Sequence, residues 1–125
     1  LYLGLPDALF YRIRAQAVQL NGGPAQNANT VTPEDLLSDL DAATALMAEA
    51  PAVVASLNDD EQAAARLAAV AGASPGPWRV SAIDPEGIDL STSCELARLW
   101  FTDPVATRED FDAMVTGLLE LRAEA

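Results

Sequence analysis

The sequence predicts an α+β fold, in which terminal strands precede a small domain of helices and antiparallel strands. Apolar residues alternate with a period of two near the N-terminus and again between residues 78 and 101. Apolar residues follow a helical period between residues 32 and 72 and again after residue 107. We therefore expect terminal strands and a linker loop over residues 1–31, and an α+β domain of order α-α-β-β-α over residues 32–125.

The first expected strand covers residues 8–20, where apolar side chains recur at alternate positions. Residues 21–31, NGGPAQNANTV, are rich in Gly and Asn and indicate a loop. An isolated strand pair would leave edge hydrogen-bond groups and aromatic surface exposed. We therefore expect residues 1–20 to pair with strands of an upstream segment or of a second copy. The interface candidates are Tyr2, Phe10 and Tyr11.

Two helices are expected next. Thr32 suits an N-cap and Pro33 the first helical position of a helix whose stripe ends at Ala50, before an interruption at Pro51. The apolar stripe of this helix comprises Leu36, Leu40, Ala43, Met47 and Ala50. The second helix starts around Asn58-Asp59-Asp60-Glu61 and stops at Gly72. Its buried side comprises Ala64, Leu67, Ala68 and Ala71.

Short strands are expected over residues 78–83, 88–90 and 95–101, followed by a last helix. In the third of these segments, Leu96, Arg98 and Trp100 alternate with Ala97, Leu99 and Phe101. Thr107-Arg108-Glu109-Asp110 resembles a capping box and predicts the start of the last helix. The apolar stripe of this helix includes Phe111, Met114, Val115 and Leu118.

The stretch IDPEGIDL places three carboxylates, Asp84, Glu86 and Asp89, around Pro85 and Gly87. A calcium loop of the EF-hand type needs Gly at its sixth position, whereas Gly87 is fourth after Asp84. Catalysis by paired carboxylates needs two acids that face one reacting atom. A turn between strands needs only what is present: Asp84 to bond the backbone, Pro85 with fixed φ, and Gly87 with φ > 0 in a G1 bulge. We predict a hairpin turn that holds no metal.

The composition excludes several functions. The chain has 125 residues and a net charge of −12, which disfavours nucleic acid and anionic membranes as partners. It has no His, so imidazole metal ligands and Ser-His or Cys-His catalysis are excluded within it. Cys94 is the single cysteine, and no basic residue stands next to it in sequence to activate it, so we expect no reactive role. The N-terminal LYLGLPD is typical of mid-protein sequence.

Other residues have a structural interpretation beside a functional one. Trp78 and Trp100 are expected to be core or interface anchors. Arginines of the strands suit an anionic ligand, but in so acidic a chain we expect them to pair with carboxylates. They are Arg12, Arg14, Arg79 and Arg98.

Residues 78–90, WRVSAIDPEGIDL, and residues 97–125 resemble the C-terminal domain of HugZ-like haem-utilisation proteins, which are similar to pyridoxamine-phosphate-oxidase-type split barrels. The N-terminal LGLPDALFYRIRAQAVQLNGG resembles the last strands of such a barrel. The residues that match the family motif are Asn58, Asp60, Trp78, Asp84, Pro85, Glu86, Gly87 and Asp89. In this family, two histidines often stand where this chain has Ser56 and Glu61, so their role is not carried over.

The resemblance implies a cytoplasmic homodimer concerned with haem binding or degradation, in which haem or FMN belongs to the full-length protein and this segment is structural and non-catalytic. The parent would then be a haem-degrading or FMN-dependent oxidoreductase. The alternative is a non-enzymatic module of the same architecture that binds a protein partner. Without His, a side-chain haem ligand from this chain is limited to Tyr, Met or Cys. We therefore expect no cofactor to be bound by this segment alone.

Overall fold

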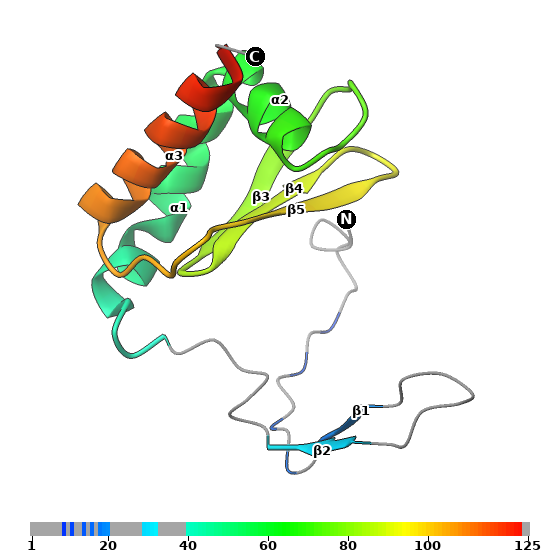
Figure 1. Cartoon of the computed structure of the whole chain (residues 1–125), viewed down its shortest axis with the longest axis vertical. Helices are drawn as coiled ribbons and strands as arrows, with labels where there is room; N and C mark the ends of the chain where they lie inside the picture. The colour runs from blue at the N-terminus through cyan, green and yellow to red at the C-terminus, as the bar shows by residue number, and fades with distance from the viewer. Residues whose placement is uncertain are drawn as a thin grey trace. The chain divides into compact units, whose positions relative to one another are not determined.

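The structure is a computed structural model, and it describes residues 9, 11, 14, 16, 18–20, 29–32 and 40–123. The chain divides into two compact units, Leu1–Ser38 and Asp39–Ala125. The expected boundary after residue 31 stays a prediction, because residues 33–39 lie outside the described part. Figure 1 labels the elements of both units.

The first unit contains a two-stranded antiparallel ladder of β1 (Val18–Leu20) and β2 (Asn29–Val31), in which Val18 pairs with Val31. The strand expected over residues 8–20 is therefore wrong in extent: Leu9, Tyr11 and Arg14 have no regular structure. The loop expected up to residue 31 is also wrong at its end, where the β-branched Thr30 and Val31 favour a strand. Tyr2 and Phe10 lie outside the described residues, and Tyr11 is 80% exposed.

Helix α1 (Thr44–Asp59) begins later than expected and continues through Pro51. Leu40 is exposed and non-helical, so the predicted stripe fails there, and residues 33–39 lie outside the described part. The predicted interruption at Pro51 is also wrong. Pro51 lies on the exposed side of the helix, where its ring costs one backbone hydrogen bond. The burial of Leu46 and Val53 on either side of it outweighs that loss.

The two other helices begin at the expected residues. Asp60 caps α2 (Glu61–Val70) by accepting a hydrogen bond from the Gln62 N–H at 2.9 Å, and Gly72 follows the helix with φ +79°. Thr107 precedes α3 (Arg108–Ala123), and its hydroxyl accepts from the Asp110 N–H at 3.1 Å. Both caps are local interactions, which explains why the sequence predicts them.

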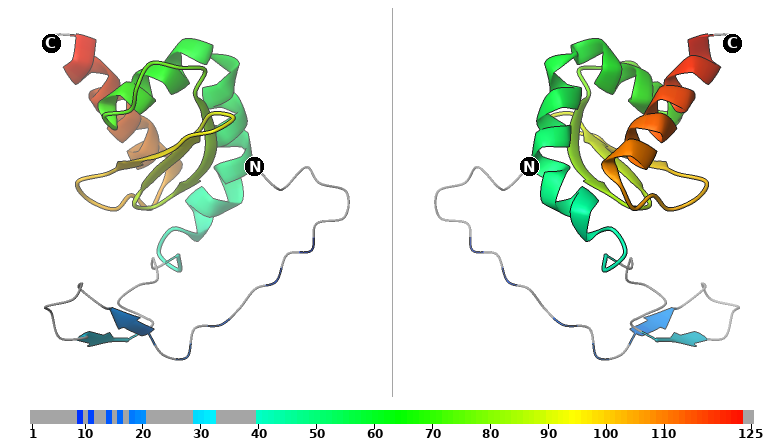
Figure 2. Two further views of the ribbon diagram at one scale, coloured as in Figure 1. Left: turned by 90° about the vertical axis from the view of Figure 1, so that its right-hand side faces the viewer. Right: turned by 90° about the vertical axis from the view of Figure 1, so that its left-hand side faces the viewer.

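The sheet of the second unit is an antiparallel meander of β3 (Arg79–Asp84), β4 (Gly87–Ser91) and β5 (Leu96–Trp100). The expected order α-α-β-β-α therefore counts one strand too few. The sheet has three strands, and two short connections join them. The unit is α+β, as predicted. Figures 1 and 2 show the three helices gathered on one side of the sheet.

The core lies between the sheet and the helices. Alternate strand residues point into it, and the ring of Phe101 meets that of Phe111 from α3 edge-on, with centroids 5.7 Å apart. The largest fully buried side chains are those of Phe111, Leu46, Leu67, Ile88, Leu90 and Val53. Within the described residues, no helix combines the length and the apolar character needed to cross a membrane.

Candidate functional site

The acidic stretch forms the hairpin turn that the sequence predicts. Asp84 pairs with Gly87 across a loop of Pro85 and Glu86, and Asp84 Oδ1 accepts a hydrogen bond from the Glu86 N–H at 2.8 Å. The expected G1 bulge is wrong, because Gly72 is the glycine with positive φ in the described part and Gly87 has none.

Gly87 is required for a different reason, which is the close approach of the neighbouring strand. A Cβ built on Gly87 would fall on the carbonyl oxygen of Leu99 in β5. The turn also contacts the segment after β5: the Phe101 N–H donates to the Glu86 carbonyl and the Val105 N–H to the Pro85 carbonyl, each at 2.8 Å. The stretch therefore fixes β5 and the entry to α3 onto the sheet.

One arginine joins the two outer carboxylates of this stretch. Arg98 Nη2 lies 2.8 Å from both carboxylate oxygens of Asp84, and Arg98 Nη1 lies 2.7 Å from Asp89 Oδ1. The guanidinium carbon lies 4.1 Å from the centroid of the Trp100 ring. We call Asp84, Asp89, Arg98 and Trp100 the Arg98 clamp. It crosses all three strands on the sheet face that carries no helix.

The electrostatics of the clamp favour a permanent charge pair. Burial alone would lower the pKa of Arg98, but its hydrogen bonds to Asp89 and Asp84 outweigh burial and raise this pKa above its ordinary value. Arg98 Nε is buried and has no hydrogen-bond partner among the described residues. Because Asp84 and Asp89 already use the other two nitrogens, Arg98 is poorly placed to bind an external anion.

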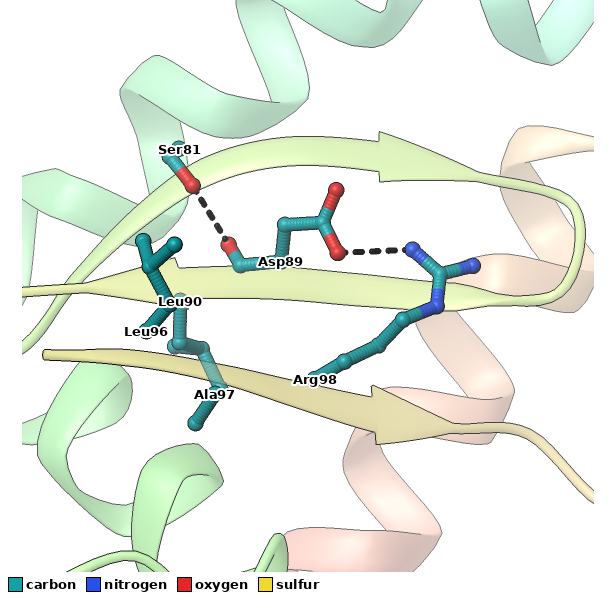
Figure 3. Close-up of a pocket in the computed structure, with 6 residues that line it drawn as sticks. All are labelled: Ser81, Asp89, Leu90, Leu96, Ala97 and Arg98. Atoms are coloured by element: carbon teal, nitrogen blue, oxygen red, sulfur yellow. Dashed lines mark hydrogen bonds and ion pairs between the residues drawn. The ribbon is translucent and has the colours of Figure 1, made fainter. Parts of the chain in front are cut away.

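The face around the clamp is open and partly apolar. Leu96 is 74% exposed and Trp100 is 63% exposed, on either side of Arg98 along β5. Figure 3 shows a shallow hollow on this face, in which the Ser81 hydroxyl donates to the Asp89 carbonyl oxygen. The hollow is lined by Ser81, Asp89, Leu90, Leu96, Ala97 and Arg98. Such a surface suits the binding of another chain better than chemistry.

The remaining residues of the family motif, Trp78, Asn58 and Asp60, lie outside the turn and the Arg98 clamp. Trp78 is buried at 4% exposure, and its Nε1 donates to the Ser74 carbonyl at 2.8 Å, so it is a core anchor as expected. Trp100, by contrast, is not part of the core. Asn58 lies near the end of α1, whereas the sequence predicts only that it contributes to the cap of α2. The cap of α2 is made by Asp60.

Asn58 instead binds the edge strand of the sheet. Its Nδ2 donates to the Val80 carbonyl at 2.8 Å, and its Oδ1 accepts from the Val80 N–H at 2.9 Å. The side-chain amide thus pairs with β3 as a neighbouring strand would. Sequence reasoning missed this contact because the two residues are 22 positions apart and no local pattern links them.

The expected pairing of strand arginines is confirmed for Arg98 but not for all members of the set. Arg79 and Arg14 are exposed, and Arg12 lies outside the described residues. Cys94 is exposed, and its sulfur lies 3.9 Å from the Thr92 hydroxyl. Among the described residues, no three His, Cys, Asp or Glu side chains gather in a group that would hold a metal ion.

No protein-family model and no curated protein matches the chain. Several solved structures do, among them the following two. A protein of unknown function from Agrobacterium tumefaciens is 44% identical, with a TM-score of 0.78 over 95% of this chain and 48% of that protein. A haem-binding protein from Mycobacterium smegmatis is 21% identical, with a TM-score of 0.59 over 90% of this chain and 48% of that protein. The chain thus spans about half the length of both proteins and shares the fold of that half.

Proposed function

We propose that this chain is the C-terminal part of a HugZ-like split-barrel protein that binds haem, and that its α+β unit is a structural module of that protein. The observation that carries the proposal is the match of 90% of the chain to about half of a longer haem-binding protein. The motif resemblance across residues 78–90 points to the same protein family. In the proposed parent, the barrel supplies the cofactor pocket and forms a cytoplasmic homodimer.

The chemistry of the described residues supports a structural role for the α+β unit. Haem carries two propionates that arginines bind well, but Arg98 already donates to Asp84 and Asp89. The clamp and the turn instead hold β5 and the start of α3 in place. This module therefore stabilises its parent rather than holding the cofactor.

The test is a haem titration followed by Soret absorbance, with the 125-residue chain and with a longer protein that includes the proposed barrel. The longer protein is expected to bind haem, and this chain alone is expected to give no axially ligated spectrum. A sharp Soret shift at one haem per chain, abolished by changing Tyr2, Tyr11, Met47, Cys94 or Met114, would contradict the structural role. Failure of the longer protein to bind haem would refute the haem proposal itself.

A second candidate function is a non-enzymatic protein-binding module. The observation that favours it is the open sheet face, on which Leu96 and Trp100 are exposed beside the Arg98 clamp. Absorbance of the longer protein with haem and with FMN separates the two functions. A pure binding module would give no cofactor spectrum with either compound.

A further inference from the structure

We propose that the outer edge of β5 binds an extended, basic segment of a partner protein, which adds to the sheet as a fourth strand. The proposal stands whether or not the longer protein binds haem. It rests on the backbone groups of β5, on the side chains of the same residues and on the charge around them.

The backbone groups at this edge follow from the register of the ladder. Gly87, Asp89 and Ser91 of β4 pair with Trp100, Arg98 and Leu96 of β5. The Phe101 N–H donates to the Glu86 carbonyl, and the Thr92 N–H donates to the Glu95 carbonyl. These bonds lie at both ends of the ladder and identify the alternating hydrogen-bonded pairs.

It follows that Leu96, Arg98 and Trp100 belong to the non-hydrogen-bonded pairs of the ladder. Their N–H and C=O groups point away from β4, toward the outside of the sheet. No described residue donates to or accepts from these groups. β5 therefore presents three donors and three acceptors in one row, which is the template that an added strand requires.

The side chains of the same three residues add apolar contact. Leu96 and Trp100 are among the most exposed large apolar side chains of the second unit. Arg98 stacks on Trp100 and is held by two carboxylates, so the indole is supported by a fixed neighbour. An incoming strand can place its own alternate side chains beside Leu96 and Trp100 on the outer face.

The charge around the edge selects the partner. Asp84 and Asp89 more than offset the charge of Arg98, and the exposed Glu95 and Asp103 flank β5 at its two ends. The whole chain carries a net charge of −12. A second copy would bring the same acidic edge and the same net charge, which opposes self-pairing. A segment with Lys or Arg at alternate positions is complementary.

The experiment titrates the 125-residue chain with a capped eight-residue peptide of alternating Val and Lys. Affinity is measured by calorimetry, and the binding site is mapped from NMR shifts of the backbone amides. The amides of Leu96, Arg98 and Trp100 are expected to shift most. Replacing Lys by Glu in the peptide is expected to weaken binding by about tenfold or more.

Two controls test the strand pairing itself. Methylating the peptide on the alternate amides that face β5 should weaken binding roughly tenfold, whereas methylating the other amides should leave it within about twofold. Leu96→Ser should weaken binding, while Ala82→Ser, at an exposed position of β3, should not.

Three results would overturn the proposal. The first is an equal effect of both methylation patterns, and the second is a set of shifts centred on β3 or on a helix. The third is a peptide-free dimer by light scattering in which the β5 amides are already protected. None of these results bears on the haem titration, so the two proposals fail separately.

Discussion

The two edges of the sheet differ in how their backbone groups are used. At β3, the Asn58 amide occupies both the N–H and the C=O of Val80, and the ladder is irregular between Val80 and Ala82. At β5, the outward N–H and C=O groups have no partner among the described residues. Proteins usually block exposed edges because they recruit other strands. The difference therefore indicates that β3 is blocked at Val80, whereas β5 is available for binding along its length.

The largest expected effect comes from forcing β5 away from the sheet. Gly87→Val places a branched side chain against the backbone of Leu99, which cannot move without breaking the ladder. We expect a loss of about 3 kcal/mol in the free energy of unfolding, measured by urea denaturation. Gly117→Ala in α3 is the matched control, because nothing lies within 4 Å of its Cβ position. It should stabilise by up to about 1 kcal/mol. Equal effects would contradict the close approach.

The next effect removes the protection of β3. Asn58→Leu leaves the N–H and C=O of Val80 without their side-chain partner in a partly buried place. We expect a loss of about 2 kcal/mol in unfolding free energy and faster exchange of the Val80 amide. Asp59→Leu, at the next exposed position of α1, is the control and should change stability by less than about 0.5 kcal/mol. If both variants behave alike, Asn58 does not protect the edge.

A smaller effect is expected from the Arg98 clamp. Arg98→Met keeps the aliphatic stem but removes the hydrogen bonds to Asp84 and Asp89. We expect a loss of about 1–2 kcal/mol on thermal unfolding. Arg66→Met is the comparison, because its ion pair with Asp60 is 3.5 Å long and more than half exposed. That variant should lose less than about 0.5 kcal/mol. The clamp has no structural role if the two losses are the same.

Local patterns in the sequence predict part of this structure, and contacts between distant residues determine the rest. Asp60 and Thr107 cap helices through hydrogen bonds to residues two or three positions away. Asp84 accepts a hydrogen bond from Glu86 in its own turn. These local features can therefore be predicted from the sequence. The alternation from Leu96 to Phe101 predicts a strand with two different faces, and the structure shows that Leu99 and Phe101 face the core.

The features that define the candidate site are not local. Asn58 reaches Val80, and Arg98 reaches Asp84 from 14 positions away. The need for Gly87 comes from Leu99 on another strand, so the turn rules predicted the right residue for the wrong reason. Pro51 shows the same limit of local sequence rules: α1 continues through this helix breaker because the burial of its neighbours in the core outweighs the local cost.

Hydrogen exchange of the backbone amides in the 125-residue chain tests the difference between the two edges most directly. The Val80 amide should exchange slowly because it donates to Asn58. The amides of Ala97 and Leu99 should also exchange slowly, because they point toward β4 and pair with it. The amides of Leu96, Arg98 and Trp100 should exchange much faster and become protected when the Val-Lys peptide binds. If these three amides are as protected as Ala97 and Leu99 in the free monomer, the β5 edge is not open and the account is wrong.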